Sequence, residues 1–472
     1  MAAMATIVLW YLVAATVRVV TANTTTSCDH VNSGYTCSPQ ISHYWGQYSP
    51  YFSVGQADAP VSSDAVPEGC TVTFAQILSR HGARDPTASK TTLYNATINR
   101  IQSSATSYGP GYEFLSDFEY TLGADQLTTF GQQELINSGI KFYQRYEALA
   151  RRGEGQYVPF VRTSGEDRVV ESAQNWTQGF HAARVADQKA VGTGGYPYNM
   201  VVISEDTGSN NTLDHGLCTA FEDGPDSDIS TNAQTEWISI FTRNITARLN
   251  SNLPGVNLTA TETIYLMDLC PFVTVADVNG KMSEFCGLFT QNEWRSYDYY
   301  QSLGKYYGFG SGNPLGPTQG VGFTNELIAR LTGTPVVDET STNHTLDNSA
   351  ATFPLNRTLY ADFSHDNDMT GIFWAMGLYN KTQSLSNTTV QSVDELDWYS
   401  ASWTVPFAAR MYVEKLQCAD HRGEELVRVI VNDRVRPLET CGGDQYGRCT
   451  LSRFVESLGF AREGGDWSSC WS

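Results

Sequence analysis

Apolar positions along the chain form short runs that alternate with longer segments of helical periodicity. Residues 71–79 make up a run rich in β-forming side chains, followed by a polar turn that contains two arginines, a histidine and a glycine. Residues 358–363 make up a second such run, followed by another polar turn and an apolar helical pattern over 370–378. A buried strand that ends in a polar turn before a helix is typical of α/β proteins, whose ligands lie at the carboxyl ends of parallel strands.

The same alternation continues elsewhere in the chain. Further apolar runs predict strands at 157–162, 200–204, 410–413 and 426–431. Apolar spacings of three and four predict helices over 91–107, 127–152, 168–180 and 323–331. The pattern therefore predicts an α/β fold with a mixed, mostly parallel central sheet flanked by helices.

Residues 207–310 show mostly helical periodicity of apolar residues, with predicted helices at 233–249, 261–269 and 292–307. A Gly- and Pro-rich stretch at 308–320 follows and predicts a loop. We interpret 207–310 as a smaller, mostly α-helical cap domain. The α/β core would then consist of residues 23–206 and 311–472.

The first 22 residues are typical of a signal peptide. Residues 7–20 are apolar apart from Thr16 and Arg18, and Val20-Thr21-Ala22 offers a small-residue cleavage site. A membrane anchor needs about 18 uninterrupted apolar residues, which Arg18 prevents. No later segment is long and apolar enough to span a bilayer, so we expect a secreted, extracellular protein that does not act in a membrane.

Cysteines and glycosylation motifs agree with export. The ten cysteines all lie beyond residue 22 and form no CxxC pair, so five disulfides are the simplest interpretation. Ten N-x-[ST] motifs indicate a heavily glycosylated protein.

A formal net charge of -20 argues against nucleic acid as a partner. An acidic surface around the basic turn of Arg80 and Arg84 suggests a focused anion pocket. Self-repulsion of an acidic protein also falls in acidic medium, which is consistent with an enzyme that works at acid pH.

The turn after the first run carries the most specific candidate chemistry. Arg80, His81 and Arg84 converge there, and Gly82 permits a tight turn. Two fixed cations beside an imidazole suggest a bound anion next to a nucleophile or base. The four fixed positions of RHGxR would match by chance in about three such sequences per thousand.

Two other strand ends add candidates that are weaker by themselves. Arg162 ends the run at 157–162, but a lone strand-end arginine is more often a surface salt-bridge partner. His365 and Asp366 end the run at 358–363, but a lone His-Asp pair is more often the cap of the next helix.

Together these motifs resemble those of the histidine acid phosphatases, which combine RHGxRxP with a distant HD. Segments such as GQYSPYF, VTFAQILSRHGAR, NPLGPTQGVGFTNELIARLT and LYADFSHDN closely resemble the secreted phytases of filamentous fungi. The resemblance covers about residues 28–470, nearly the whole mature chain.

The resemblance implies a role for each motif residue. His81 would be the nucleophile that forms a phosphohistidine, and Asp366 would protonate the leaving alkoxide. The phosphoryl oxygens would be held by Arg80, Arg84, Arg162 and His365. No metal or other cofactor is implied, because guanidinium groups can neutralise the charge of the transition state.

Six further positions match residues that line the substrate pocket in the family: Gln47, Tyr48, Lys90, Asp214, Lys305 and Asn367. For each of them a purely structural role is a substantial alternative. The chain departs from some relatives at Gly304, where they carry a second lysine, at Phe309, where some have histidine, and at Asp85, where an aromatic residue is common.

The resemblance also implies the disulfide pairing Cys28–Cys37, Cys70–Cys418, Cys218–Cys470, Cys270–Cys286 and Cys441–Cys449. We expect a monomeric acid phosphomonoesterase that acts on phytate (myo-inositol hexakisphosphate), of the 3-phytase type. The alternatives are a broad-specificity acid phosphatase of the same family and a non-catalytic glycoprotein that binds inositol phosphates.

Overall fold

The computed structural model describes residues 27–57, 59–192 and 195–471. The predicted signal peptide lies outside these residues. Within them, no helix is long and apolar enough to cross a membrane.

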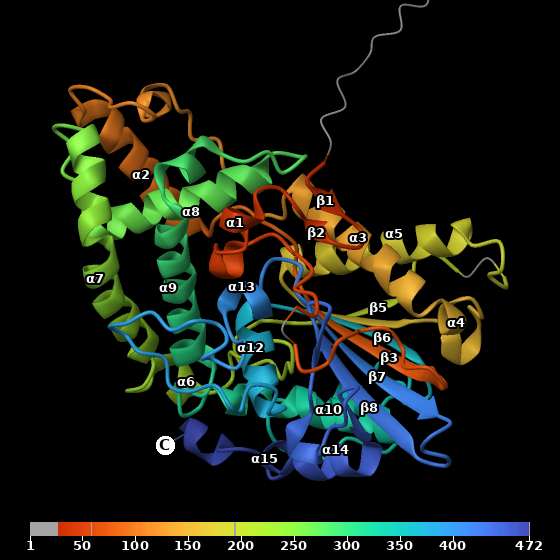
Figure 1. Ribbon diagram of the computed structural model, residues 1–472. Coiled ribbons are helices and arrows are strands. Elements are labelled where there is room, and N and C mark those ends of the chain that lie inside the picture. The colour runs from red at the N-terminus through yellow and green to blue at the C-terminus, as the bar shows by residue number, and fades with distance from the viewer. Residues whose placement is uncertain (1–26, 58, 193–194, 472) are drawn as a thin grey trace, which may run out of the picture.

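A mixed sheet of eight strands forms the centre of the molecule, in the order β10-β8-β7-β3-β6-β4-β5 with β9 paired to β8 (Figure 1). Strands β3, β6, β4 and β5 run parallel, and β7, β8, β9 and β10 complete the sheet in antiparallel pairings. The bounds are β3 Cys70–Arg80, β4 Phe160–Ser164, β5 Met200–Ile203, β6 Leu359–Ser364, β7 Arg410–Cys418, β8 Glu425–Val431, β9 Arg434–Arg436 and β10 Arg448–Thr450. The predicted α/β fold with a mixed sheet is confirmed.

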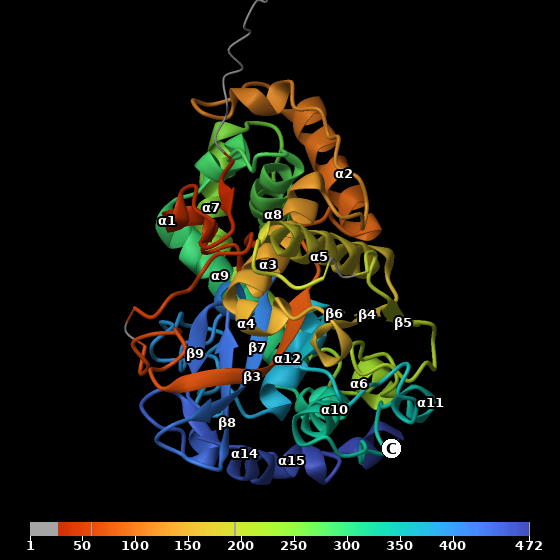
Figure 2. The same cartoon turned by 90° about the vertical axis from the view of Figure 1, so that its right-hand side faces the viewer.

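Helices cover both faces of this sheet (Figure 2). On one face, Phe142 of α3 (Thr129–Arg145) and Trp176 of α5 (Asp167–Ala186) pack on strand residues such as Ile77. On the other face, α10 (Val321–Thr332) and α12 (Asp366–Ala375) pack on the alternate strand residues, among them Leu78. Burial on both faces explains why β3 has a continuous apolar run rather than an alternating pattern.

The three helices predicted within 207–310 are present as α7 Ile229–Asn252, α8 Ala260–Ala276 and α9 Gln291–Phe309, and α8 extends seven residues beyond its predicted end. They share an apolar core with α2 (Ala88–Ser104), which lies outside that range in the sequence. Figure 1 shows these four helices beside the sheet, at the upper left. The division into a core and a cap domain stays a prediction.

Short elements complete the chain: β1 Asp29–His30, β2 Gly34–Tyr35, α1 Pro39–Ser42, α4 Glu147–Ala150, α6 Thr219–Asp223, α11 His344–Asp347, α13 Ala401–Thr404, α14 Leu451–Ser457 and α15 Gly459–Arg462, with 3-10 turns between several of them. The helix predicted over 127–152 is interrupted at Tyr146, whose ring is buried under the sheet.

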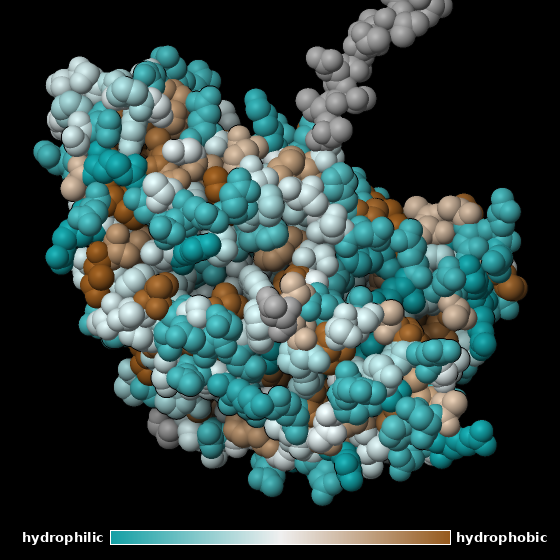
Figure 3. Space-filling view, viewed as in Figure 1, coloured by the Kyte–Doolittle hydropathy of each residue, from teal (hydrophilic) through white to brown (hydrophobic). Residues whose placement is uncertain are grey.

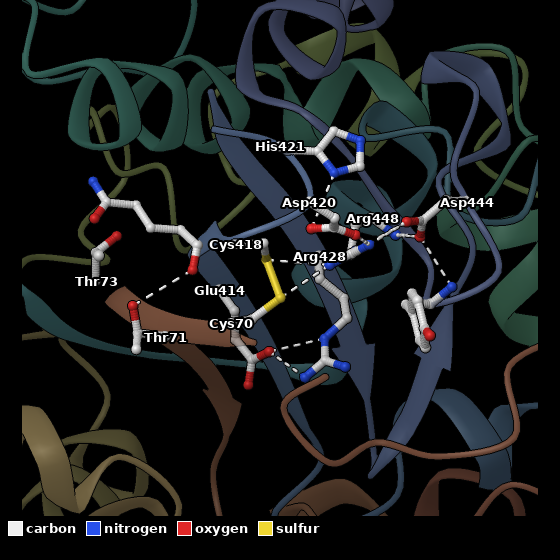
Figure 4. The surroundings of a disulfide bond; sticks show 12 residues. Cys70, Thr71, Thr73, Glu414, Cys418, Asp420, His421, Arg428, Asp444 and Arg448 are labelled. Carbon is white, nitrogen blue, oxygen red and sulfur yellow. Dashed lines mark hydrogen bonds and ion pairs between the residues drawn. A yellow bond between two sulfur atoms is a disulfide. The ribbon is translucent and has the colours of Figure 1, made fainter. Parts of the chain in front are cut away.

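All five predicted disulfides are present with the implied pairing. Cys70 and Cys418 are directly opposed in the register of β3 and β7, so their bridge closes the amino end of the strand that leads to His81. Arg448 donates hydrogen bonds to both sulfur atoms, at 2.9 and 3.1 Å, and pairs with Asp420 and Asp444 (Figure 4).

Candidate active site

The carboxyl ends of the four parallel strands meet at one edge of the sheet. There β3 ends at Arg80, β6 at Ser364, β4 at Ser164 and β5 at Ile203. A pocket of about 320 Å³ lies at this edge. It is lined by Gln47, Tyr48, Arg84, Thr87, Glu166, Arg168, Glu205, Asp214, His215, Lys305, His365, Asp366, Asn367 and Asp368.

His81 lies next to this pocket, with its ring 5.6 Å from that of His365. Its Nδ1 is 2.8 Å from the carbonyl oxygen of Gly82, which can only accept, so Nδ1 carries the hydrogen and Nε2 keeps a free lone pair. Burial, reinforced by the charges of Arg80 and Arg168, holds the pKa of His81 well below its usual range. His81 is therefore a neutral imidazole with Nε2 available as a nucleophile.

Three guanidinium groups surround the imidazole. Arg80 is fully buried, donates to the carbonyl of Val405 at 2.8 Å and lies over the ring of Phe407. The Nε atoms of Arg80, Arg84 and Arg168 are buried and find no acceptor among the described residues. Fixed cationic donors of this kind, in a site shielded from water, are suited to hold an anion.

Asp366 is the first residue of α12 and faces two cations rather than capping the helix. Its Oδ2 lies 2.5 Å from Lys305 Nζ and 3.5 Å from Arg80 Nη2. Burial opposes its ionisation, but the charges of Arg80 and Lys305 and the Lys305 hydrogen bond hold the pKa of Asp366 well below its usual range. In this structure Asp366 is a carboxylate.

His365 is held by Glu205, whose Oε1 lies 3.0 Å from His365 Nε2. Burial lowers the pKa of His365, but the hydrogen bond with Glu205 and the charges of Asp368 and Glu205 together more than offset this and raise it. Burial raises the pKa of the Glu205 carboxyl group, but its hydrogen bond with His365 and the charge of His365 lower this pKa to about 2. His365 is therefore a cation at acid pH.

The prediction that Arg162 contacts the substrate is not supported by its position. Arg162 lies in the middle of β4, 2% exposed, and its guanidinium binds Glu326 at 2.6 and 2.8 Å and Asp362 at 2.9 Å. Asp362 is its neighbour in the register of β4 and β6. Each of its three guanidinium nitrogens donates within this buried network, and Arg162 is not among the residues that line the pocket.

Arg168, which was not among the predicted site residues, lies where Arg162 was expected. It lies in the first turn of α5, lines the pocket and is paired with Glu166. The strand ends at Ser164, two residues later than predicted, and the helix begins at Asp167. The same rule of strand, polar turn and helix would have found Arg168 if the end of the strand had been placed correctly.

The outer residues predicted from the resemblance mostly meet at the pocket, which Gln47, Tyr48, Asp214, Lys305 and Asn367 line. Asn367 Oδ1 accepts a hydrogen bond from Lys305 Nζ at 2.5 Å. Lys90 is not among the lining residues. Its Nζ lies 5.1 Å from the ring centroid of Tyr265 in α8 and 5.9 Å from that of Tyr94 in α2.

The chain departs from some relatives at Asp85, Phe309 and Gly304, and none of these three residues is among those that line the pocket. Asp85 accepts a backbone hydrogen bond from Gly123, and burial is the main cause that raises its pKa. Phe309 packs on His215, with ring centroids 5.2 Å apart. A side chain at Gly304 would meet Gln234, since a Cβ there lies 2.5 Å from Gln234 Nε2.

Comparison with known proteins gives a consistent result. Residues 71–432 match the family model of the histidine phosphatase superfamily (branch 2). The chain is 54% identical to Phytase A of Aspergillus oryzae over 448 residues, which cover 94% of each chain. It is 47% identical to Phytase A of Neurospora crassa over 508 residues, which cover 98% of each chain.

Solved structures share the fold at low sequence identity. The phytase from D. castellii superimposes with a TM-score of 0.73 at 22% identity, covering 92% of this chain and 88% of that one. A multiple inositol polyphosphate phosphatase from Bifidobacterium longum gives a TM-score of 0.63 at 15% identity, covering 88% of this chain and 97% of that one.

Proposed function

Because the chain belongs to the histidine phosphatase superfamily, branch 2, we propose that it is an acid phosphomonoesterase that hydrolyses phytate through a phosphohistidine. The observation that carries the proposal is one pocket, lined by Arg84, Arg168 and Asp366, beside which the neutral imidazole of His81 and the guanidinium of Arg80 lie. The names of the curated relatives supply the substrate class.

In the first step, Nε2 of His81 attacks phosphorus and forms an N–P bond as the P–O bond to the inositol oxygen breaks. Asp366, protonated in the complex, gives its proton to that oxygen, which would otherwise be too basic to leave. In the second step, water attacks the phosphohistidine, Asp366 takes a proton from it, and inorganic phosphate and neutral His81 are released.

The cations around His81 hold the three non-bridging oxygens of the transferring group. Arg80, Arg84, Arg168 and His365 supply this charge from fixed positions, so little reorganisation is required as the transition state forms. Arg168 replaces Arg162 in this assignment.

Substrate binding can itself prepare the proton donor. Lys305 and Arg80 keep Asp366 ionised in the free protein. A phosphate group that engages these two cations brings negative charge next to Asp366, which raises its pKa and favours the protonated acid. This coupling would confine activity to acidic solution.

We predict that Lys305→Met shifts the alkaline limb of the pH–activity profile to higher pH. The rate falls as pH rises through the pKa of Asp366, because only the protonated carboxyl can act as the acid. Lys305 lowers that pKa, so its removal raises it, by about 1 pH unit or more for a cation in direct contact. The measurement is kcat/KM for β-glycerophosphate against pH, with Lys305→Arg as the charge-conserving control. An unchanged limb in the methionine variant would contradict the coupling.

Arg168 and Arg162 provide a matched pair of substitutions. We expect Arg168→Ala to lose about 10²–10³ in kcat/KM, as for other groups that stabilise transition-state charge, with stability nearly unchanged. Arg162→Ala would instead lose about 3–5 kcal/mol of stability, because Glu326 would remain buried without its cation and Asp362 would keep only Arg330. Calorimetry and initial rates distinguish the two, and a stable but inactive Arg162→Ala would restore that residue to the substrate site.

The substrate assignment is tested by comparing kcat/KM for phytate with that for p-nitrophenyl phosphate. A strong preference for the aryl ester would favour the broad-specificity phosphatase. Proton and phosphorus NMR of the first inositol pentakisphosphate would show whether the 3-phosphate is removed first, as the 3-phytase type requires. Binding of phytate without any release of phosphate would favour the non-catalytic glycoprotein.

The setting of the proposed enzyme is extracellular. Its five disulfides are typical of an oxidising compartment. Hydrophilic residues are spread across the face shown in Figure 3, over both the helical part and the sheet. We propose a secreted monomer whose partner is its small, polyphosphorylated substrate, with neither nucleic acid nor membrane required.

A further inference from the structure

The first two turns of α3 pack directly on the backbone of the turn that carries His81. A Cβ at Gly82 would lie 2.3 Å from the carbonyl oxygen of Gly131, so neither position has room for a side chain. Thr128, the N-cap of α3, donates from both its N–H and its hydroxyl to the carbonyl of Ala83. Ala83 is thereby fixed to the start of α3.

Glu134, one turn further along α3, completes this attachment. Its side chain is 1% exposed. Oε2 accepts the N–H of Ala83 at 2.8 Å, and Oε1 accepts the N–H of Tyr51 at 2.9 Å. A buried carboxyl group is costly unless its oxygens are hydrogen-bonded, and here both are used by backbone donors.

The peptide unit that Glu134 contacts also contacts His81. The N–H of Ala83 and the C=O of Gly82 belong to one planar peptide, so fixing the direction of the first fixes the second. The C=O of Gly82 accepts the hydrogen of His81 Nδ1. A continuous chain of hydrogen bonds therefore runs from Glu134 through this peptide to the imidazole.

We propose that Glu134 is a positioning residue that orients His81 through the Gly82–Ala83 peptide. By holding the Gly82 carbonyl toward Nδ1, it favours the tautomer in which Nε2 is unprotonated and aims the Nε2 lone pair into the pocket. The proposal rests on the proposed function, in which His81 is the nucleophile.

The surroundings of Glu134 indicate whether its charge or its hydrogen-bond acceptor is needed to hold the Gly82–Ala83 peptide. Burial and the charge of Asp29 raise the pKa of Glu134 to about 8, while the Ala83 and Tyr51 N–H groups and Arg410 act in the opposite direction. Both the carboxylate and the carboxylic acid offer an acceptor at Oε2. The role of Glu134 therefore requires an acceptor for the Ala83 N–H, not a charge.

The test compares Glu134→Met, which keeps the length of the side chain but has no acceptor, with Glu134→Gln, which keeps one. Phosphoenzyme formation from ³²P-labelled p-nitrophenyl phosphate is followed by rapid quench in alkali, in which a P–N bond is stable. This substrate is chosen because its leaving group does not need Asp366. We expect the methionine variant to form phosphoenzyme about 10- to 100-fold more slowly, as is typical when a group that orients an active-site residue is lost. The glutamine variant keeps an acceptor for the Ala83 N–H and should form phosphoenzyme at close to the wild-type rate. If the methionine variant does not fold, a loss of about tenfold or more in the glutamine variant would overturn the role as an acceptor.

Asp338→Asn is the control for lost stability alone. Asp338 is also buried, and it accepts from the Thr340 N–H and from Asn325 at 2.7 Å, in a loop that contributes no residue to the pocket lining. This variant should be destabilised but form phosphoenzyme at the wild-type rate. An equal loss of rate in Asp338→Asn and Glu134→Met would overturn the proposal.

A second measurement needs no turnover. Nitrogen NMR of ¹⁵N-histidine-labelled protein, with His81 assigned from His81→Ala, should show the Nδ1–H tautomer in wild type and its loss or mixing in Glu134→Met. The proposal would be overturned if Glu134→Met kept the wild-type tautomer of His81, or if it formed phosphoenzyme at a rate within twofold of wild type. If wild type forms no phosphoenzyme at all, the proposed function fails, whereas the dependence of the tautomer on residue 134 is still measured.

Discussion

Replacing His81 with alanine is expected to lower the turnover of phytate by at least about 10⁴-fold and to remove the covalent intermediate, because its imidazole is the group that attacks phosphorus in the proposed mechanism. His81 has the features that a nucleophile needs: a depressed pKa, an Nδ1 bound to Gly82 and a free Nε2. The measurement is alkaline quench of the enzyme with ³²P-labelled phytate, followed by separation of protein from substrate. Wild type should yield a phosphoprotein that is labile in acid and stable in alkali, as a P–N bond is.

His365→Ala is the matched control for this experiment. His365 lies beside His81 but is a cation held by Glu205, so its loss should slow phosphoryl transfer without removing the nucleophile. Labelled protein should therefore still accumulate, more slowly. Full activity of His81→Ala, or label of equal lability in that variant, would show that another residue is the nucleophile.

The sequence supports prediction of the main framework because the relevant patterns are local. A strand buried on both faces gives a continuous apolar run, and this located β3 and β6 together with the turns that follow them. The disulfide pairing could not be predicted from local patterns, since ten cysteines allow many pairings. Only the family resemblance selected the pairing that is present.

The residues that were missed depend on contacts between distant parts of the chain. Arg162 and Arg168 are both arginines near the end of an apolar run, and only the partners Glu326 and Asp362 show that Arg162 belongs to the interior. Glu134 was likewise one polar residue of a helical pattern, and its contact with Ala83 follows from how α3 packs on the turn. One-dimensional periodicity contains no information about either contact.

Asp366→Asn is expected to separate two substrates that differ in their leaving groups. For phytate the leaving oxygen is a basic alkoxide, so loss of the acid should lower kcat by about 10²–10⁴-fold. For p-nitrophenyl phosphate the leaving phenolate is stable without a proton, and the loss should be less than about tenfold. Initial rates on both substrates at acid pH, with the phosphoenzyme level in each case, provide the measurement.

The same substitution also removes the partner of Lys305, and this effect has to be separated from the loss of the acid. Lys305 contacts both Asp366 and Asn367, so Asp366→Asn leaves it with Asn367 as an acceptor. Asn367→Ala is therefore the control, because it disturbs Lys305 while leaving the carboxyl group in place, and it should affect both substrates alike. If Asp366→Asn lowers the two rates by the same factor, Asp366 holds Lys305 and Arg80 in position and another group protonates the leaving oxygen. A large loss confined to phytate is explained only by proton transfer from Asp366, since charge and geometry at the phosphoryl group are common to both substrates.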